Sequence, residues 1–430
     1  MLLPKIYFHT FGCRLNQGET SILEGLFKQA DFEITTKKEQ ADIFLINTCT
    51  VTANGDLDTR KLINQIIRAN PNAKIAIIGC QAQTQKQELL TLPKVKWVIG
   101  NSDKMELVDI IKNSLKSITT SVIVNPIPKK YFSMPIVMHS NTHTRANLKI
   151  QDGCDYFCSY CEVPFARGRS RSRVFGNILE EAELLAKNGY KEIVLTGVNT
   201  GTYEFKDKRL LNVLKSITEL AGIERVRISS IEPKTTGLEI FKFMVKNKKV
   251  CRHLHSPVQS CNDTILKAMN RIYSFAEFKD FILSVKKLVP DICIGTDVIV
   301  GFPGETEELF NDTYQKLETL PIDYFHVFSY SKRKLARSKD LPDHISAAII
   351  QKRSQKLRQL GILKRQKFFK SLLGQTVPVL FEQKKNGFWS GLTSHYVRVL
   401  MKSDQDLRNK ICLVKLEKIE GQNIIANFTN

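Results

Sequence analysis

Residues 150–173 read IQDGCDYFCSYCEVPFARGRSRSR, and the interpretation of the whole chain starts from this stretch. Three cysteines, Cys154, Cys158 and Cys161, lie in it at a C-x₃-C-x₂-C spacing, with Tyr160 directly before the third. Four arginines follow at once: Arg167, Arg169, Arg171 and Arg173. Because three thiols so close in sequence must converge from one loop, we expect them to hold one metal centre.

The number of cysteines indicates which centre the loop holds. A structural zinc ion takes four ligands, and an iron–sulfur cube commonly takes four thiolates for its four irons. Three thiolates therefore leave one iron without a protein ligand, and an open coordination position can hold a substrate. The alternative is a zinc loop completed by a distant ligand, although no fourth Cys or His lies nearby at zinc-ribbon spacing.

The loop resembles that of the radical S-adenosylmethionine (SAM) enzymes. The resemblance implies that the free iron chelates the amine and carboxylate of SAM. It also implies that the reduced cluster cleaves SAM to a 5′-deoxyadenosyl radical. Cys154, Cys158 and Cys161 are then the metal ligands and the catalytic centre.

Composition bounds the architecture and the partners. A length of 430 residues leaves room for about three domains. No apolar run is long enough for a membrane span, and the N-terminus reads as a strand rather than a signal peptide, so we expect a cytoplasmic protein. Ten cysteines then favour metal or redox chemistry over disulfides. A net charge of +21 favours a polyanionic partner, most simply nucleic acid, with simple solubility as the alternative.

Residues 1–118 alternate between apolar runs and amphipathic stretches, which predicts a parallel sheet with helices. The expected strands are 5–13, 42–51, 74–80 and 96–101. The expected helices are about 16–30, 56–70 and 102–117, with a short one before the last strand. Residues 119–143 are interpreted as a linker because they hold three prolines and a polar run.

Three more cysteines, Cys13, Cys49 and Cys80, fall at or near the ends of the first three predicted strands. The carboxyl ends of parallel strands lie along one edge of a sheet, where open α/β sheets bind ligands. We therefore expect these thiols, far apart in sequence, to meet and to hold a second iron–sulfur cluster. Three isolated buried cysteines are the alternative.

Residues 144–369 carry six apolar runs that alternate with helical patterns. The runs are 148–154, 191–199, 225–233, 253–260, 292–305 and 324–331. This order predicts a partial (β/α)6 barrel with its activity at the carboxyl ends of the strands. The candidates for contacting SAM are Tyr160 in the loop and, near strand ends, Gly197, Asn199, Ser230, Glu232, Gln259 and Gly301. Each of these, taken singly, is equally consistent with an ordinary turn.

The basic segment 332–370 ends in an expected amphipathic helix with Leu357, Leu360 and Leu363 on one face. Its Lys and Arg residues face either phosphates or solvent. Residues 370–430 then change to short β runs, which predicts a small all-β barrel. Such barrels often bind RNA, and Phe388, Trp389, Tyr396 and Arg398 are either RNA contacts or core residues.

The order of these parts resembles the radical SAM methylthiotransferase family, in which the last part is the RNA-binding module called TRAM. The motifs that carry the resemblance are FGCRLNQGET (11–20), INTCTV (46–51) and CDYFCSYCEVPFARGRSRSR (154–173). Within the family, the chain is most similar to the branch that modifies threonylcarbamoyladenosine. The motifs for that branch are LKIQDGC (148–154), EIVLTGVNTGTY (192–203), RVRISSIEP (225–233) and HLHSPVQS (253–260).

The resemblance implies methylthiolation of C2 of N6-threonylcarbamoyladenosine at position 37 of tRNA. SAM would act as radical source and as methyl donor, and a low-potential electron donor would be a partner. Two 4Fe–4S clusters are implied, and the one on Cys13, Cys49 and Cys80 would present the sulfur. We also expect Arg167 or Arg173 to pair with the carboxylate of the threonylcarbamoyl group.

Other functions stay open at this point. The same family modifies isopentenyladenosine in tRNA or an aspartate of a ribosomal protein, and only a tRNA enzyme should bind tRNA with steep salt dependence. A zinc-carrying RNA-binding protein would contain no iron. A radical SAM enzyme with one cluster would contain about four irons rather than about eight.

Overall fold

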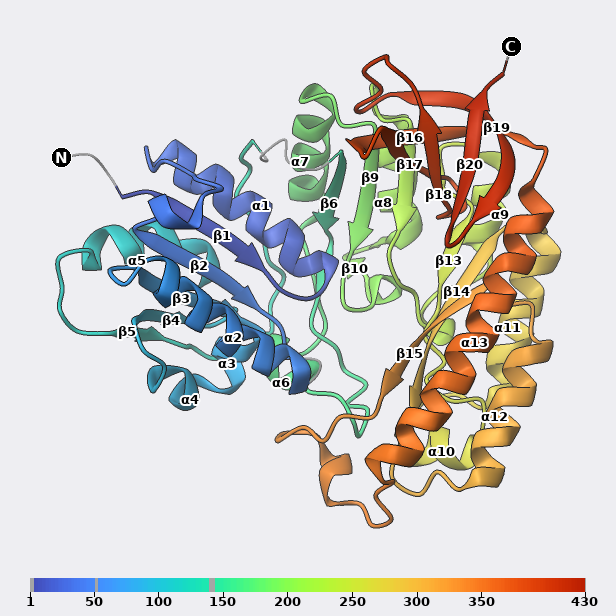
Figure 1. Cartoon of the computed structure of the whole chain (residues 1–430), viewed down its shortest axis with the longest axis horizontal. Coiled ribbons are helices and arrows are strands. Elements are labelled where there is room, and N and C mark those ends of the chain that lie inside the picture. Colours follow the sequence, from blue (N-terminus) through green and yellow to red (C-terminus); the bar gives the residue numbers. More distant parts are fainter. Residues whose placement is uncertain (1–3, 51–52, 139–143, 430) are drawn as a thin grey trace.

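The structure is a computed structural model that describes residues 4–50, 53–138 and 144–429. Two predicted features end outside these ranges: the tail of the second strand at Val51 and the polar run 139–143 of the linker. Figure 1 shows an N-terminal sheet on the left, a central set of long strands and a small barrel at the upper right. Among the described helices, none combines the length and the apolar character needed to cross a bilayer.

The N-terminal part is a five-stranded parallel sheet in the order β1-β2-β3-β4-β5, which confirms the predicted architecture. Its strands are β1 (Ile6–Thr10), β2 (Ile43–Thr48), β3 (Lys74–Gly79), β4 (Val95–Ile99) and β5 (Ser121–Ile123). Its helices are α1 (Arg14–Gln29), α2 (Ala53–Ala69), α3 (Cys80–Thr84), α4 (Lys86–Leu90) and α5 (Leu107–Ser114). The sheet has one strand more than expected, because β5 comes from the segment interpreted as a linker.

Both faces of this sheet are covered, which explains its apolar strands. β2 is buried along its whole length. Phe44 and Ile46 pack with Leu62 and Ile66 of α2, whereas the alternate residues pack under α1 and α5. Because both faces are covered, the carboxyl ends of the strands are the part of the sheet where we look for a functional site.

The central part contains the six parallel strands that the sequence predicts, arranged as an open barrel. They are β6 (Arg145–Lys149), β9 (Glu192–Thr196), β12 (Arg225–Ile228), β13 (His253–His255), β14 (Cys293–Val300) and β15 (Tyr324–Ser329). A bridge between Val226 and Val250 joins the two halves β12-β9-β6 and β13-β14-β15. Outer helices cover the strands: α7 (Phe175–Lys187), α8 (Leu210–Glu219), α9 (Glu239–Lys246), α10 (Asp263–Ala268), α11 (Phe275–Leu288) and α12 (Glu307–Thr319). A hairpin of β10 (Glu204–Phe205) and β11 (Lys208–Arg209) precedes α8.

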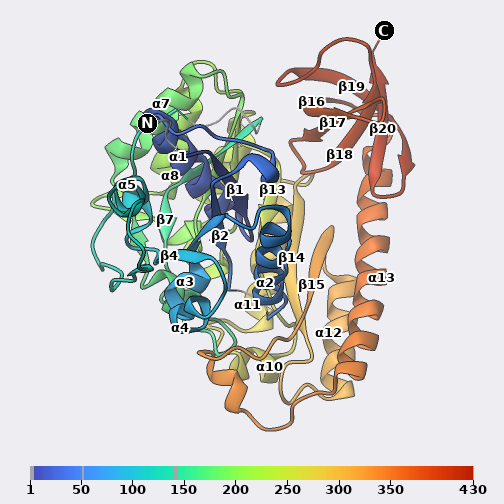
Figure 2. The same cartoon turned by 60° about the vertical axis from the view of Figure 1, so that its left-hand side comes forward.

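The long helix α13 (Ala347–Leu372) runs along the central part toward the C-terminal barrel, as Figure 2 shows. Leu357 and Leu360 are buried on it, but Leu363 is 62% exposed. The prediction that all three share one face was wrong. At 3.6 residues per turn, two successive steps of three residues rotate a side chain by about 120° off the starting line.

The C-terminal part is a closed barrel in the order β16-β17-β18-β20-β19, which confirms the all-β prediction. Its strands are β16 (Thr376–Lys385), β17 (Phe388–Thr393), β18 (Arg398–Lys402), β19 (Ile411–Glu420) and β20 (Asn423–Phe428). Residues 388–402 form the two strands β17 and β18, divided by a turn in which Tyr396 has a φ of 63°.

Candidate functional site

The cysteine loop is closed at its base by a two-residue antiparallel ladder. In this ladder β7 (Gln151–Asp152) pairs with β8 (Arg171–Ser172), and the short helix α6 (Val163–Arg167) lies between them in sequence. Gly153 has a φ of 72°, and a Cβ there would come within 2.0 Å of the Arg169 carbonyl oxygen. Only glycine permits this close approach of the two ends of the loop.

Arg271 attaches the cysteine loop to the central barrel. Its Nη1 donates to Cys158 Sγ and to Tyr160 Oη, both at 3.5 Å, and its Nη2 pairs with Glu232. Ser159 N also donates to the Met269 carbonyl at 2.9 Å. Burial opposes ionisation of Glu232 and raises its pKa, while Arg271 favours the carboxylate. The loop is therefore fixed beside a charged pair at the rim of the barrel.

The thiols of this loop fit a metal centre that stabilises their thiolate forms. Burial raises the pKa of Cys154 to about 11 and also raises the pKa of Cys161. These thiols therefore remain protonated at neutral pH unless a bound cation stabilises the thiolates. The donor set of three clustered cysteines suits iron–sulfur ligation.

The spacing of the sulfurs argues against a preformed zinc site in either cysteine group. Tetrahedral zinc with bonds of about 2.3 Å holds its sulfurs about 3.8 Å apart. Within the described ranges, the one group of His, Cys, Asp or Glu with all ligand atoms within 4.8 Å is His255, Asp297 and His326. Neither cysteine group meets this limit in the described part of the chain, so its sulfurs lie farther apart than those of a formed zinc site.

Gln151 gathers several of the predicted SAM-contacting residues below the loop. Its Oε1 accepts from Asn199 N at 3.0 Å and would lie 2.8 Å from a Cβ on Gly197, while its Nε2 donates to the Gly153 carbonyl at 2.8 Å. Asn199 Oδ1 accepts from Thr235 at 3.1 Å. The Ser230 carbonyl accepts from Thr200 N, which draws the end of β12 toward the end of β9. Glu232 N donates to Asn199 Oδ1 at 3.5 Å, so Gly197, Asn199 and Ser230 lie together with a fourth predicted residue, Glu232.

The remaining predicted SAM contacts separate into two places. Tyr160 and Gln259 line one cavity of about 160 Å³ together with Asp297 and Phe328. Gly301 lies elsewhere: a Cβ there would meet Ile350 of α13 at 2.3 Å. The glycine at this position therefore allows α13 to pack closely against the backbone. In sequence, a glycine after a strand looks the same whether it serves helix packing or ligand binding.

Three buried or half-buried hydroxyls at strand ends were missed in the sequence. They belong to Thr196, Ser229 and Ser256, at the ends of β9, β12 and β13. Within the described residues none of the three has a hydrogen-bond partner. Buried polar groups normally have partners, so these atoms fit a polar ligand such as SAM. The signal was a hydroxyl residue at the end of three strands in succession.

The N-terminal cysteines come together at the carboxyl edge of their sheet. Cys13 precedes α1, Cys49 follows β2 and Cys80 begins α3. Gly12 has a φ of 89°, and a Cβ there would lie 2.8 Å from Cys49 Sγ. Desolvation raises the pKa of Cys13, although part of this residue is open to solvent; Arg167 lowers that pKa and Cys80 raises it. All three cysteines are thus neighbours.

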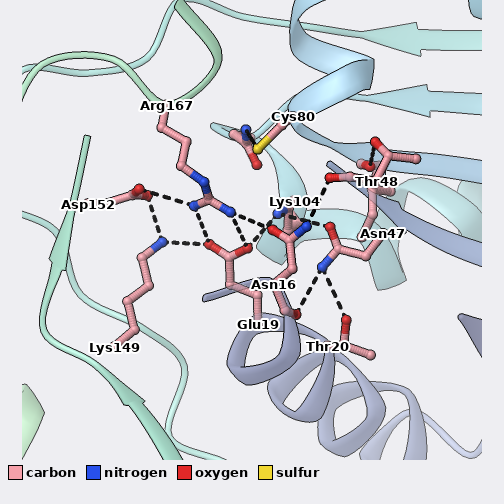
Figure 3. Close-up of polar contacts among 12 residues, drawn as sticks. Asn16, Glu19, Thr20, Asn47, Thr48, Cys80, Lys104, Lys149, Asp152 and Arg167 are labelled. Atoms are coloured by element: carbon pink, nitrogen blue, oxygen red, sulfur yellow. Dashed lines mark hydrogen bonds and ion pairs between the residues drawn. The ribbon is translucent and has the colours of Figure 1, made fainter. Parts of the chain in front are cut away.

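A buried network of charged side chains joins this edge to the cysteine loop, as Figure 3 shows. Glu19 of α1 accepts from Lys104 at 2.6 Å and from Lys149 at 2.7 Å. Arg167 contacts Glu19 at 3.0 Å and Asp152 at 3.1 Å. Burial opposes ionisation of Glu19, but Arg167 and the two lysines outweigh it and hold its pKa well below the ordinary value.

The network has more basic than acidic groups. Arg171 also reaches Asp152, at 3.2 Å, so four basic side chains face two carboxylates. Arg167 additionally donates to Asn16 at 2.6 Å. The side chains of Lys104, Glu19 and Arg167 are at most 3% exposed. Basic groups therefore outnumber carboxylates beside Cys13 and Cys80, and burial lowers the pKa of one of them, Lys104.

A second polar junction lies beside the other members of the two cysteine groups. Thr50, next to Cys49, donates to Glu162, next to Cys161, at 2.9 Å. Arg333 donates to the same Thr50 hydroxyl at 2.9 Å and to Glu162 at 3.1 Å.

Asn101 forms a third link. Its Nδ2 donates to the Ala166 carbonyl at 2.7 Å and lies 3.7 Å from Cys80 Sγ. Because Ala166 belongs to α6, Asn101 connects the N-terminal cysteines to the helix that follows the loop. The three junctions place both cysteine groups on one interface.

The structure does not leave Arg167 or Arg173 available for a substrate carboxylate, so that prediction was wrong. Arg167 is 2% exposed and Arg173 is fully buried. Arg173 donates to Asn177 at 2.7 Å and pairs with Glu181. Both guanidinium groups are held by protein acceptors, and the arginine-rich pattern alone carries no signal for burial.

The four predicted RNA contacts of the C-terminal barrel are partly core residues. Trp389 is 7% exposed and belongs to the barrel core, against which Tyr396 packs. Tyr396 also accepts from Arg14 at 2.9 Å, and Arg398 pairs with Glu382. Phe388 is half-buried, with Lys402 5.2 Å from its ring centre.

Comparison with protein-family models matches two parts of the chain. Residues 148–317 match the Radical SAM superfamily, and residues 5–100 match Uncharacterized protein family UPF0004. The first range contains the cysteine loop, the end of β6 and the four central strands β9, β12, β13 and β14. The second contains Cys13, Cys49 and Cys80.

Curated relatives match nearly the whole chain. The threonylcarbamoyladenosine tRNA methylthiotransferase MtaB of Bacillus subtilis is 35% identical, over 97% of this chain and 94% of that protein. The tRNA-2-methylthio-N(6)-dimethylallyladenosine synthase of Fervidobacterium nodosum is 32% identical, over 97% of each chain. Among solved structures, the radical S-adenosylmethionine methyltransferase TsrM of Kitasatospora setae has a similar fold, with a TM-score of 0.56 at 15% identity and coverage of 76% and 73%.

Proposed function

The chain belongs to the radical SAM methylthiotransferase family, and from this premise we propose that it methylthiolates C2 of N6-threonylcarbamoyladenosine at position 37 of tRNA. Family membership brings SAM and one 4Fe–4S cluster. The exact base, the second cluster and the use of SAM as methyl donor are the content of the proposal.

The observation that carries the proposal is the meeting of two cysteine groups on one interface. A methylthiotransferase must bring a radical source and a sulfur source to the same carbon. The Thr50–Glu162 contact joins the residues that follow Cys49 and Cys161. The Asn101–Ala166 contact joins a side chain 3.7 Å from Cys80 Sγ to the helix that follows the loop. A C–H bond at C2 of adenine has no useful acidity, so a side-chain base cannot activate it and a radical route is chemically suited.

Cys154, Cys158 and Cys161 are assigned to the cluster that SAM binds. When bound, the reduced cluster supplies the electron that cleaves SAM. The chain's own residues position the partners: Arg271 holds the loop through Cys158 and Tyr160, and Gln151 connects the loop to Gly197 and Asn199. The unpartnered hydroxyls of Thr196, Ser229 and Ser256 offer hydrogen bonds to SAM.

Cys13, Cys49 and Cys80 are assigned to a second 4Fe–4S cluster that presents the sulfur. Three thiolates on a cubane make an anionic centre, and the buried network beside them has four basic groups against two carboxylates. The excess charge suits such a centre, since unpaired buried charge is otherwise costly. Arg167 is the member of the network that interacts with both Cys13 and Cys80.

The choice of base rests on the relatives. Three MtaB proteins named for threonylcarbamoyladenosine match at 36%, 35% and 31% identity, and synthases named for dimethylallyladenosine match at 31–32%. The two higher identities both belong to MtaB proteins. The net charge of +21 and the C-terminal barrel, of the size and position of a TRAM module, support tRNA as the partner. The reaction also requires a low-potential electron donor. We place it in the cytoplasm, consistent with ten cysteines of which none forms a disulfide.

The test is an anaerobic reaction with two anticodon stem-loop RNAs that differ only at position 37. One carries N6-threonylcarbamoyladenosine and the other N6-isopentenyladenosine. Mass spectrometry of the digested nucleosides is expected to find a methylthio group in place of one hydrogen on the threonylcarbamoyl nucleoside. Methyl-labelled SAM is expected to transfer its label to that product.

If only the isopentenyl RNA were modified, the substrate would be N6-isopentenyladenosine and not the proposed N6-threonylcarbamoyladenosine. Modification of neither RNA, together with methylthiolation of a ribosomal protein, would reject the tRNA function. A protein with iron but an unlabelled methylthio product would contradict SAM as the methyl donor.

A further inference from the structure

A cavity of about 560 Å³ lies where the three parts of the chain meet. Each part contributes to its walls: Arg14 and Gln17 from α1, Arg145 and Asn147 from β6, and Lys384 and Trp389 from the C-terminal barrel. Its volume lies within the range of about 300–1,000 Å³ that is typical of small-molecule and cofactor sites. The cavity is separate from the residues assigned to SAM.

The walls of this junction cavity are strongly basic. Arg14, Arg145, Lys384 and Arg408 line it, and among the described lining residues Glu382 is the one acidic group. Glu382 is itself paired with Arg145 at 2.6 Å and with Arg398. Its charge is therefore already compensated within the protein, which leaves a surplus of positive charge suited to an anion.

Three polar atoms in the walls are buried without partners in the described part of the chain. They are the donors Trp389 Nε1 and Arg145 Nη1 and the acceptor Asn147 Oδ1. Trp389 is 7% exposed, so its indole N–H has lost most of its access to bulk water. Because buried polar groups are normally satisfied, the cavity presents hydrogen-bonding capacity for a ligand that has both acceptors and donors.

The position of the cavity links it to the N-terminal cysteines. Arg14 directly follows Cys13 and donates to Tyr396 at 2.9 Å. Tyr396 in turn packs against His253 of β13, with ring centres 4.6 Å apart. A ligand in the cavity thus lies beside the residue that follows a proposed cluster ligand and near the amino ends of β6 and β13.

We propose that the junction cavity binds one nucleotide of the RNA substrate, a nucleotide other than the one that is modified. Its phosphate contacts Arg14, Arg145 and Lys384, and its base or ribose bonds to Trp389 and Asn147. The inference rests on the proposed function, because it takes RNA as the substrate. It adds a composite site that exists only when all three parts are docked, and so makes RNA binding depend on the geometry that unites the two cysteine groups.

The test measures the affinity of the cluster-loaded enzyme for its tRNA as a function of salt. Lys384→Gln is expected to weaken binding and to reduce the slope of log K against log salt by about 0.7–0.9, the effect of one lost phosphate contact. Trp389→Phe keeps a ring in the barrel core and removes the N–H. It is expected to weaken binding by about 3- to 10-fold with an unchanged salt slope.

Lys415→Gln is the matched control, because Lys415 is an exposed lysine on β19 outside the cavity. Lys384 is also exposed, so its replacement leaves the proposal testable even if Trp389→Phe fails to fold. Inorganic phosphate and AMP are added in competition. We expect that neither competitor displaces the RNA when its concentration is near the dissociation constant of the RNA.

Two results would overturn the inference while leaving the proposed function intact. In the first, wild type binds and modifies tRNA, and both cavity variants match Lys415→Gln in affinity and salt slope. The cavity would then be a hydrated groove that binds no nucleotide. In the second, AMP displaces the RNA at equal concentration, which identifies a mononucleotide site. A wild type that neither binds nor modifies tRNA instead contradicts the proposed function itself.

Discussion

The two cysteine groups are built in opposite ways. Cys154, Cys158 and Cys161 come from one short loop, closed by the ladder of β7 and β8 and by the tight approach at Gly153. Cys13, Cys49 and Cys80 come from three strand ends of one sheet. The first group is thus defined by local sequence, whereas the second exists only after the whole N-terminal sheet has formed.

The groups also differ in their electrostatic surroundings. Arg271 beside Cys158 is matched by Glu232, so its charge is neutralised locally. Arg167 beside Cys80 belongs to a network in which basic groups outnumber carboxylates. Arg167, Lys149 and Arg171 belong to the central part and Lys104 to the N-terminal part, so the N-terminal group receives most of its positive charge from the other domain. Binding of the proposed second cluster would therefore be coupled to the docking of the two domains.

The largest expected effect separates the two groups by reaction. Replacing Cys154, Cys158 and Cys161 by alanine should abolish formation of 5′-deoxyadenosine, because the site that binds SAM loses its protein ligands. Product is measured by chromatography under anaerobic conditions with a strong reductant. A variant that still forms 5′-deoxyadenosine at the wild-type rate would contradict the assignment of this loop.

The second-largest effect concerns Arg167, the cation that the central part places beside the N-terminal cysteines. Arg167→Met removes a cation from two carboxylates that are at most 3% exposed, and it is expected to cost about 3–5 kcal/mol in the free energy of unfolding. The variant should also retain less iron at the N-terminal group after gel filtration. Urea unfolding and iron analysis measure both effects.

Arg169→Met is the matched control on the same loop. Its guanidinium is 56% exposed and contacts Asp155 at 3.4 Å, so its replacement is expected to cost less than about 1 kcal/mol. Equal stability and equal iron in the two variants would show that the buried network has no special role.

The smallest expected effect tests the junction at Thr50. Thr50→Val removes the hydroxyl that bonds Glu162 and Arg333, while those two remain paired, so a loss of about 1–3 kcal/mol is expected. Thr91→Val is the control, since the exposed Thr91 hydroxyl bonds only the Glu88 carbonyl in the described structure. Thermal unfolding of both variants in the iron-free state measures the loss of stability. Equal losses in the two variants would show that the Thr50 hydroxyl does not stabilise the junction.

Alternation of apolar runs and helical patterns was sufficient to predict the parallel sheet, the six central strands and the terminal barrel. The short strand β5 was missed because Ser121–Ile123 carries too few residues for a periodic signal. Leu363 was misassigned because a spacing of three residues drifts off the helix face. Local pattern thus predicts elements well, while their edges depend on tertiary contacts.

For the site, one cysteine at each of three strand ends was a strong signal, because parallel topology brings those ends together. The roles of Arg167, Gln151 and Arg271 were not predictable. Each acts through partners far away in sequence: Glu19 for Arg167, Asn199 for Gln151 and Cys158 for Arg271. An arginine that follows a metal loop looks the same in sequence whether it is buried in a network or exposed to a substrate.

The most direct test of the central claim is the iron and sulfide content after anaerobic reconstitution, for wild type and for Cys13→Ala/Cys49→Ala/Cys80→Ala. The account predicts that the variant loses about half of the iron, from about eight to about four atoms per chain, and still cleaves SAM. Equal iron in the two proteins would contradict it, because the strand-end cysteines would then hold no cluster and the reaction would lack its sulfur source.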